Sequence, residues 1–241
     1  MISVRTKLYF SMENLILQQF FVFTFPERHD KMCSYLYFSF LRGQTMDSNF
    51  FALISRMRYI ARWGLMRNAL PENIQEHSHM VAVLAHALGV IRRDIFHQPC
   101  DVNALATAAL YHDASEILTG DLPTPIKYHN AEIMSAYHAV EDLAVQKLLG
   151  MLPPELRETY ADVLAEDKDG DIYPLVKAAD KLSAYIKCIE ERKAGNNEFL
   201  SAEAQTRAAL EASPLPEGQY FLEHFIPAFE RDLDELGAIG Q

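Results

Sequence analysis

The sequence predicts an all-α protein, and three observations support this fold class. From residue 46 onward, apolar residues recur at spacings of three and four, as on a helix with one buried face. Glycines and prolines separate these stretches at places that suit connections between helices. No stretch alternates apolar and polar residues with a convincing period of two, as a half-buried strand would.

Eight helices are expected from these signals. Asp47 or Ser48 is placed to cap the first of them, and Asn73 with Glu76 three residues later resembles a capping box. Gly120 is placed to end the third helix. The expected helices cover residues 47–63, 73–95, 103–118, 126–149, 153–166, 172–194, 198–212 and 220–236.

Length and composition fit an ordinary globular protein. The chain has 241 residues, 49% of them hydrophobic, so it can bury a core without disulfide bonds. Its formal net charge of −11 argues against a nucleic-acid partner, because proteins that bind nucleic acid irrespective of sequence carry basic stripes. A small anionic substrate remains compatible, since a metal ion and one or two arginines make a local positive site.

The cysteines and the apolar runs bear on the compartment. Three widely spaced cysteines without a Cys-x-x-Cys pair indicate neither a zinc knuckle nor a disulfide framework. A reduced, cytoplasmic protein is the simplest interpretation. The apolar run at residues 15–25 is shorter than the about 20 residues that a membrane span needs, so we expect no membrane partner.

Residues 1–45 differ from the rest of the chain. They are rich in Phe and Tyr and hold five basic and three acidic residues, which gives this segment a net charge of +2. A signal peptide is one interpretation, but Gln18 and Gln19 interrupt the apolar run and no small-residue cleavage site follows it. We expect residues 1–45 to be an atypical extension, for example from an overcalled start, and residues 46–241 to form the functional domain.

The chain has nine histidines, and helical geometry separates candidate metal ligands from histidines that should face away from the core. His77 begins a predicted stripe of apolar positions that continues through Val81, Leu84, Leu88, Ile91 and Ile95. His79 and His86 lie about 200° and about 180° around the helix from His77, so both should face away. The remaining histidines without a ligand partner at helical spacing are assigned to surface or structural roles: His29, His97, His129, His138 and His224.

The stretch 111–125, YHDASEILTGDLPTP, holds the densest group of candidate ligands and acid–base residues. A distant carboxylate joins it, because an aspartate in the middle of an apolar helical stretch is costly to bury unless it is paired or binds a metal. Together, two imidazoles and two carboxylates lie on three predicted helices: His77, His112, Asp113 and Asp180. Each has an ordinary structural explanation when taken alone. The set suits a divalent ion such as Mn, Co, Mg or Zn, with coordination positions left open for catalysis.

The order His77, His112-Asp113, Asp180 resembles the HD-domain metal phosphohydrolases. The flanking residues narrow the resemblance to the bacterial HD-domain 5'-deoxynucleotidases, and it runs from about residue 46 to near the C-terminus. The residues that carry it are RW at 62–63, MRN at 66–68, EN at 72–73, EHS at 76–78, YHDASE at 111–116, LTGDLPTP at 118–125, KAAD at 177–180 and AGNNEF at 194–199. The TGDLPTP loop with the upstream Arg-Trp pair is its most specific part.

The resemblance implies an HD-domain helical bundle that hydrolyses deoxyribonucleoside 5'-monophosphates to deoxynucleosides and phosphate. It also implies one divalent cation (cobalt or manganese in vitro), broad base tolerance and a homodimer. The metal ligands that it implies are His77, His112, Asp113 and Asp180. The implied substrate-binding residues are Arg62, Trp63, His77, Asp113, Asp121, Leu122, Pro123, Thr124 and Asp180. The implied catalytic residues are Arg62 at the phosphate, with Glu116 and Asp121 near the attacking water.

Elementary chemistry agrees with these roles and leaves some of them open. The phosphoryl transition state spreads charge over its equatorial oxygens, which the planar guanidinium of Arg62 can neutralise. Glu116 lies four residues after His112, on the same predicted helical face, so it can act as a general base or orient the water. Asp121 could protonate the leaving 5'-oxygen or bind the sugar. Ordinary alternatives are a surface role for Glu116 and Arg62 and core packing for Trp63.

Two other functions are compatible with the sequence. One is an HD phosphohydrolase acting on nucleoside triphosphates or cyclic dinucleotides, although a triphosphate calls for more basic residues than surround Arg62. The other is a non-catalytic helical module whose metal is structural. The site of such a module would be coordinatively closed and would not need Glu116, Asp121 or Arg62.

Overall fold

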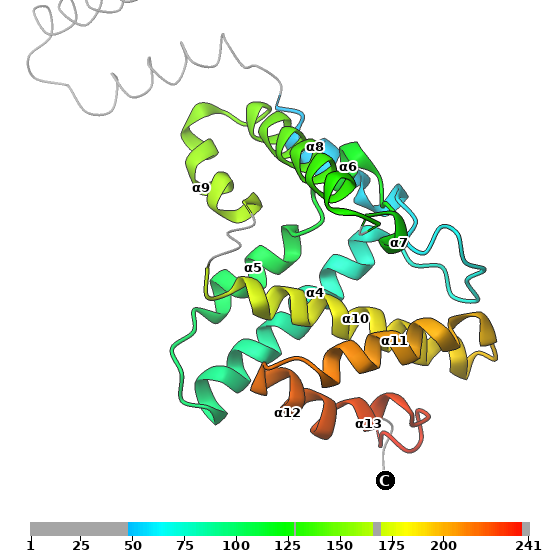
Figure 1. Cartoon of the computed structure of the whole chain (residues 1–241). Coiled ribbons are helices and arrows are strands. Elements are labelled where there is room, and N and C mark those ends of the chain that lie inside the picture. The colour runs from blue at the N-terminus through cyan, green and yellow to red at the C-terminus, as the bar shows by residue number, and fades with distance from the viewer. Residues whose placement is uncertain (1–47, 128, 166–169, 238–241) are drawn as a thin grey trace, which may run out of the picture. The chain divides into compact units, whose positions relative to one another are not determined.

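The computed structural model describes residues 48–127, 129–165 and 170–237, and these ranges fold into helices joined by loops, of which the one before α4 (Ile74–Val90) is long (Figure 1). The α-helices are α3 Phe50–Ile54, α4 Ile74–Val90, α5 Val102–Tyr111, α6 Glu116–Thr119, α7 Thr124–Lys127, α8 Ala131–Gly150, α9 Pro154–Leu164, α10 Tyr173–Lys193, α11 Leu200–Glu211, α12 Pro216–His224 and α13 Ile226–Phe229. Tighter or wider helical turns lie at Ser55–Tyr59, Asn197–Phe199 (3-10) and Ile91–Ile95 (π). The expected all-α class is confirmed.

Within the described ranges, the sole strand-like feature is an isolated antiparallel bridge between Ala61 and Asn73. None of the helices in these ranges is long and apolar enough to cross a membrane. The predicted extension, residues 1–45, lies outside the described residues and stays a prediction.

Helices α4, α5 and α10 pack against one another and supply most of the main core. The core includes fully buried leucines from each of the three helices: Leu88, Leu105 and Leu182. A second, smaller core joins Phe50 of α3 to α8 and α9. In Figure 1, α8 and α9 lie above α4 and α10, and α11 to α13 lie below. The main core therefore fixes the three helices on which the candidate ligands were expected.

The start of α4 follows the sequence closely. The capping box is confirmed, because Glu76 N donates to Asn73 Oδ1 at 3.1 Å and Asn73 N donates to Glu76 Oε2 at 3.3 Å. The predicted stripe is buried at His77, Val81, Leu84, Leu88 and Ile91. Ile95 was wrongly placed on it and is 47% exposed. The wider π turn changes the residue spacing before Ile95, which rotates its side chain out of the stripe.

The first expected helix was too long. It ends at Ile54 and passes into a 3-10 turn, and Trp63 has a φ of 57°, which a right-handed helix does not contain. Ser48 does not cap it, since its hydroxyl donates to Met151 O at 2.6 Å. The alternative cap, Asp47, lies outside the described residues.

Three other expected helices are divided. The helix over 103–118 breaks after Tyr111 and resumes as α6, and the helix over 126–149 is divided into α7 and α8. Asn130 begins α8 by accepting from Ile133 N at 2.8 Å, a cap that was not predicted from the sequence. The last helix begins earlier, at Pro216, and is interrupted before Pro227, whose ring removes a backbone donor.

Candidate metal centre

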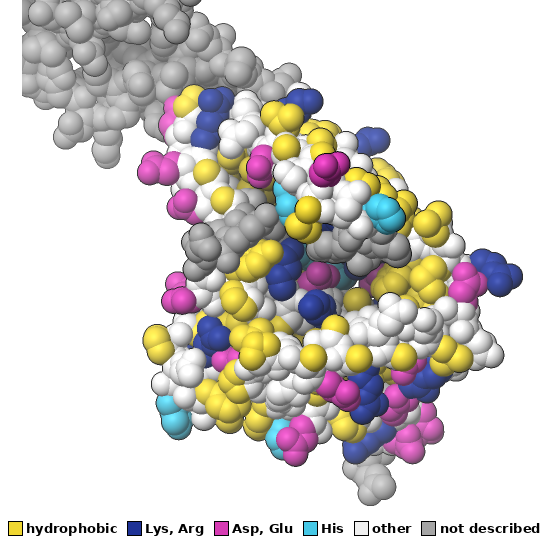
Figure 2. Space-filling view, in the orientation of Figure 1, with side chains coloured by type: hydrophobic (Ala, Val, Ile, Leu, Met, Phe, Trp, Pro, Cys, Tyr) yellow, Lys and Arg dark blue, Asp and Glu magenta, His cyan; other side chains and the backbone are white. Residues whose placement is uncertain are grey.

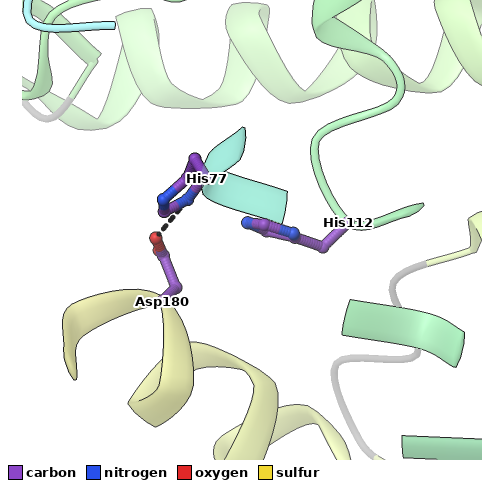
Figure 3. A group of neighbouring side chains, drawn as sticks. All are labelled: His77, His112 and Asp180. Atoms are coloured by element: carbon purple, nitrogen blue, oxygen red, sulfur yellow. Dashed lines mark ion pairs between the residues drawn. The ribbon is translucent and has the colours of Figure 1, made fainter. Parts of the chain in front are cut away.

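The four candidate ligands come together where α4 and α10 face the turn that follows α5. His77 Nε2 lies 3.1 Å from Asp180 Oδ1 and 3.5 Å from Asp113 Oδ2, and His112 Nε2 lies 3.2 Å from Asp113 Oδ2. One ligand atom from each of His77, His112 and Asp180 falls within 4.8 Å of the others, and the three side chains point toward a common centre (Figure 3). These separations match those between ligands of a single cation.

The Nδ1 atoms of His77 and His112, which face away from the centre of the cluster, have partners that fix the orientation of the rings. His112 Nδ1 lies 2.7 Å from the carbonyl oxygen of Ala109, so this nitrogen carries the proton and donates. His77 Nδ1 lies 3.2 Å from the hydroxyl of Ser183. A second partner of this kind is typical of histidines that bind metals, because it selects the tautomer whose Nε2 lone pair faces the ion.

The Nε2 atoms of the two histidines, which face the centre of the cluster, show whether the residues fit a cation. Nε2 of His77 and Nε2 of His112 are buried, and neither makes a hydrogen bond within the described part of the chain. A buried polar atom left without a partner costs about 1–3 kcal/mol. A divalent ion between these nitrogens and the two carboxylates would satisfy both, so the donor set fits Mn, Co, Zn or a similar metal.

Charge within the cluster favours ionised carboxylates. Burial alone would raise the pKa of Asp113 and of Asp180, but the neighbouring imidazoles outweigh it and hold both pKa values below their usual range. The same carboxylates raise the pKa of His112 against the effect of its burial. A divalent cation held between these residues would therefore meet ionised carboxylates, which are the form that binds a metal.

The turn at residues 112–115 explains how His112 and Asp113 both face the centre. The Ala109 carbonyl accepts from the His112 side chain, and the turn continues with bonds to the third residue back, Ala114 N to Tyr111 O and Glu116 N to Asp113 O. A side chain that bonds a carbonyl of its own helix competes with the next helical turn. The helix therefore ends at the site.

The loop between α3 and α4 carries Arg62 to the same place. Arg62 Nη1 donates to Asp113 Oδ2 at 3.3 Å, and Arg62 Nε donates to Glu72 Oε2 at 3.2 Å. Its side chain is 14% exposed, so Arg62 is not the ordinary surface arginine considered above. Burial lowers its pKa, but Asp113, Asp180 and Glu72 outweigh that effect and raise it. A permanent positive charge thus lies beside the candidate ligands.

Trp63 is neither a simple core residue nor a freely exposed one. Its ring is half-buried and packs edge-on against Phe199 at 5.3 Å between centroids. Its indole Nε1 donates to Glu72 Oε2 at 3.1 Å. Arg62 and Trp63 therefore share one carboxylate.

One face of α10 serves both the candidate ligands and the Arg62 loop. Asp180, Ser183, Lys187 and Glu191 follow at intervals of three, four and four residues, which places them on one stripe of the helix. Asp180 lies at the centre, and Ser183 contacts His77. Of these four residues, only Asp180 was predicted from the sequence, although Lys187 and Glu191 have the four-residue spacing of a helical ion pair.

Lys187 and Glu191, the last two residues of the stripe, bind the loop between α3 and α4. Glu191 Oε2 accepts from Ala69 N at 2.8 Å, and Glu191 Oε1 accepts from Leu70 N at 2.9 Å. Lys187 Nζ donates to Glu191 Oε1 at 2.5 Å and to the Leu70 carbonyl. Asn196 Nδ2 also donates to Glu191 at 2.7 Å, which gives a role to part of the AGNNEF segment. Glu191 is thus fully buried and saturated with donors.

Replacing Glu191 with Ala is expected to lower the melting temperature by about 10 °C. Breaking a buried ion pair costs about 3–5 kcal/mol, and each kcal/mol shifts the melting temperature of a domain of this size by roughly 2–4 °C. Thermal unfolding followed by circular dichroism measures the change. Glu190→Ala, on the exposed side of the same helix, is the control and should shift it little. Equal melting temperatures for the two variants would contradict the anchoring role.

Glu116 begins α6 and is 5% exposed, which excludes the surface role considered for it. Burial, reinforced by Asp113 and Asp121, raises its pKa to about 9, and Oε2 has no hydrogen-bond partner in the described structure. Burial also raises the pKa of Asp121, with Arg62 opposing. Both acids therefore lie within electrostatic reach of the cluster.

The TGDLPTP loop follows α6 directly and contains Asp121. Gly120 ends α6 with a φ of 75°, as the sequence predicted, and Leu122 and Pro123 follow half-buried. The backbone of Thr124 begins α7, but its side chain lies outside the described part. A second view shows the domain hollowed between the parts that contain α8 and α10, with basic, acidic and histidine side chains gathered there (Figure 2). The hollow is open to solvent in this view (Figure 2).

Glu116 makes stability depend on pH in the metal-free protein. Its folded pKa lies above the unfolded value, so its contribution is fully present below about pH 4.5 and is lost as pH rises toward about 9. Metal-free Glu116→Gln should therefore melt above metal-free wild type at about pH 8, by at least about 3 °C, and the gap should close toward about pH 5. Melting curves at both pH values measure the gap. A gap that does not change with pH would refute the raised pKa.

The other described histidines stay outside the cluster, as predicted. His79, His86, His97 and His129 are exposed. His138 pairs with Glu141 at 2.9 Å, and His224 lies against the Tyr220 ring. His29 lies outside the described residues.

The fold and this site together define the class of HD-domain phosphohydrolases, helical proteins with His, His-Asp and Asp ligands from separate elements. An HD-domain phosphohydrolase from Listeria innocua superposes with a TM-score of 0.68 at 25% identity, covering 77% of this chain and 90% of that one. The HD-domain helical bundle expected from the sequence is confirmed.

More similar sequences identify the family. The family model described as 5'-deoxynucleotidase YfbR-like matches residues 49–229. The proteins named 5'-deoxynucleotidase YfbR from Shigella boydii and from Escherichia coli K12 are each 50% identical to this chain over 191 residues, which covers 79% of this chain and 96% of each relative. The chain therefore belongs to the YfbR-like 5'-deoxynucleotidase family.

Proposed function

We propose that this protein is a metal-dependent 5'-deoxynucleotidase, a phosphoric monoester hydrolase that converts deoxyribonucleoside 5'-monophosphates to deoxynucleosides and phosphate. The observation that carries the proposal is the direct contact between Arg62 and the candidate ligand Asp113. A guanidinium in contact with a candidate metal ligand supports a phosphate-binding role for Arg62 beside a divalent cation. The family relatives, which are named 5'-deoxynucleotidases, support the substrate class.

The metal, cobalt or manganese, would be held by His77, His112, Asp113 and Asp180. When bound, such a cation polarises a phosphoryl oxygen and lowers the pKa of a coordinated water. The Ala109 carbonyl and the Ser183 hydroxyl hold the two imidazoles with Nε2 inward. The charge of Arg62, whose Nη1 already points at the cluster, would orient the phosphate and offset charge in the transition state.

The remaining roles follow from position. Trp63 and the loop that begins at Asp121 would enclose the nucleoside. Glu116 and Asp121 would exchange protons with the attacking water and the leaving 5'-oxygen, and a buried acid with a raised pKa is suited to hold such a proton at neutral pH. The proposed substrate-binding set is Arg62, Trp63, His77, Asp113, Asp121, Leu122, Pro123, Thr124 and Asp180.

The proposal includes a cytoplasmic homodimer. Phe51 and Leu110, which are 52% and 43% exposed, line one groove between α3 and α5. Exposed apolar side chains beside a groove are a feature of surfaces that bind another protein. Light scattering on the purified protein tests the dimer.

Phosphate release from three nucleotides tests the function. The full-length protein is stripped of metal, supplied in turn with Mn, Co, Mg or Zn, and given dAMP, AMP or dATP. The proposal predicts metal-dependent release from dAMP that exceeds release from AMP and from dATP. Equal rates on dAMP and AMP would contradict the deoxyribose preference, and release from dATP alone would favour a triphosphate hydrolase. Repeating the assay on a protein that begins at Met46 tests whether residues 1–45 are dispensable.

Metal binding without turnover is the outcome that favours the remaining alternative. If every added metal raised the melting temperature and none of them supported phosphate release, the metal would be structural. The buried carboxyl of Glu116 argues against that outcome, because its Oε2 has no hydrogen-bond partner in the described structure and a structural metal site does not require such a group.

A further inference from the structure

We propose that Glu72 is a positioning residue that holds Arg62 and Trp63 as one rigid unit at the substrate site. This inference rests on the proposed function for the roles of those two side chains, but the contact itself is independent of it. Glu72 belongs to no ligand set or acid–base pair described above. It acts through its neighbours, at the end of the loop that leads into α4.

Glu72 accepts three hydrogen bonds from Arg62 and Trp63. Glu72 Oε2 accepts from Arg62 Nε at 3.2 Å and from Trp63 Nε1 at 3.1 Å. The backbone carbonyl of Glu72 accepts from Arg62 N at 3.0 Å. One residue thus fixes the main chain at Arg62 and the side chains of both functional residues. Its own side chain is 16% exposed, so water competes little for these bonds.

The backbone at Trp63 shows why such a hold is needed. Trp63 has a φ of 57°, in the left-handed region that bulky residues rarely occupy. A conformation of this kind costs about 1–3 kcal/mol and persists only where the surroundings impose it. The indole bond to Glu72 and the packing on Phe199 fix the two ends of the ring. The Trp63 ring is therefore held in one position beside the proposed nucleoside site. A rigid ring excludes the additional hydroxyl of ribose better than a mobile ring does.

The geometry at Arg62 divides the guanidinium between two tasks. Nε is occupied by Glu72, while Nη1 faces the metal centre and contacts Asp113. A phosphate can take up the Nη side while the Nε bond stays in place, so Arg62 meets its substrate already oriented. Orientation of this kind matters because a misplacement of about 1 Å can reduce the rate about a hundredfold.

Trp63 is the single tryptophan of the chain, so its fluorescence reports this contact directly. Three full-length variants are compared with wild type: Glu72→Ala, the isosteric Glu72→Gln, and Glu190→Gln as control. Glu190 lines the same cavity as Glu72 and is exposed, and no hydrogen bond links it to the pair. Emission and acrylamide quenching are measured without metal or substrate. Values of kcat and KM for dAMP and AMP are then measured with Mn.

Glu72→Ala should red-shift the emission and increase quenching, because the indole loses its partner and becomes mobile. Its kcat/KM for dAMP should fall by about ten- to a hundredfold, with the larger part in kcat because orientation is lost, and the preference for dAMP over AMP should narrow. Glu72→Gln, whose carbonyl can still accept, should lie between Ala and wild type by every measure. Glu190→Gln should match wild type.

Unchanged emission and quenching in Glu72→Ala would overturn the inference, whatever the kinetics. A kinetic defect equally large for Gln and Ala, with unchanged dAMP preference, would also overturn it, since that is the effect of lost charge or general destabilisation. A wild-type protein that releases no phosphate would contradict the proposed function alone. The fluorescence comparison would then still decide whether Glu72 holds Trp63.

Discussion

Replacing Asp180 with Asn is expected to lower phosphate release from dAMP by more than about a hundredfold and to remove the thermal stabilisation given by metal. Changes in the partners of metal ligands cost about 10–100-fold in metal affinity or activity, and loss of a ligand should exceed that. Asn keeps the shape of the side chain but not the charge that a cation and the His77 imidazole require. Phosphate release and melting temperature, each with and without Mn, measure both effects.

The position of Asp180 makes this the most severe single change. It is the one candidate ligand that α10 contributes, and no other carboxylate of the described part of α10 lies in the cluster. Asp142→Asn, on the exposed face of α8, is the matched control and should behave as wild type. Activity of Asp180→Asn within about tenfold of wild type would remove this residue from the ligand set.

Glu116→Gln is expected to lower kcat by about a hundredfold to ten-thousandfold while metal binding persists. General acid–base groups contribute rate factors of this size, and Gln preserves the volume of the buried side chain without its proton chemistry. The assay is kcat for dAMP at saturating Mn, with the metal-induced rise in melting temperature as the binding control. Glu132→Gln, exposed on α8, is the matched variant.

Two results would contradict this role of Glu116. If Glu116→Gln kept the kcat of wild type, Glu116 would transfer no proton in the reaction. If the variant lost the metal-induced stabilisation, Glu116 would be a metal ligand instead. The same substitution is predicted to stabilise the metal-free protein at alkaline pH. A residue that costs stability and supplies rate is the usual pattern of a functional site.

The sequence predicted those features that depend on neighbouring residues. The capping box at Asn73 and Glu76, the buried stripe from His77 to Ile91 and the stop at Gly120 each follow from local spacing. The convergence of His77, His112 and Asp180 was also predictable, because each was expected on the apolar face of a predicted helix and apolar faces meet in the core.

Features that depend on distant partners were not predictable. The break after Tyr111 arises because the His112 imidazole takes the Ala109 carbonyl, which sequence spacing does not reveal. Ser183 and Glu191 looked like ordinary helical residues until the structure showed them beside His77 and the Arg62 loop. Glu72 is the same case, since only the fold brings its carboxylate to both Arg62 and Trp63.

One measurement tests the metal centre as the origin of activity most directly: phosphate release from dAMP by metal-stripped, full-length protein as Mn or Co is added in steps. A single centre built from His77, His112, Asp113 and Asp180 predicts no release without metal. It also predicts a rise that levels off at one equivalent of bound ion per chain. Full activity in the presence of a chelator, or a rise that continues to two bound ions, would contradict it.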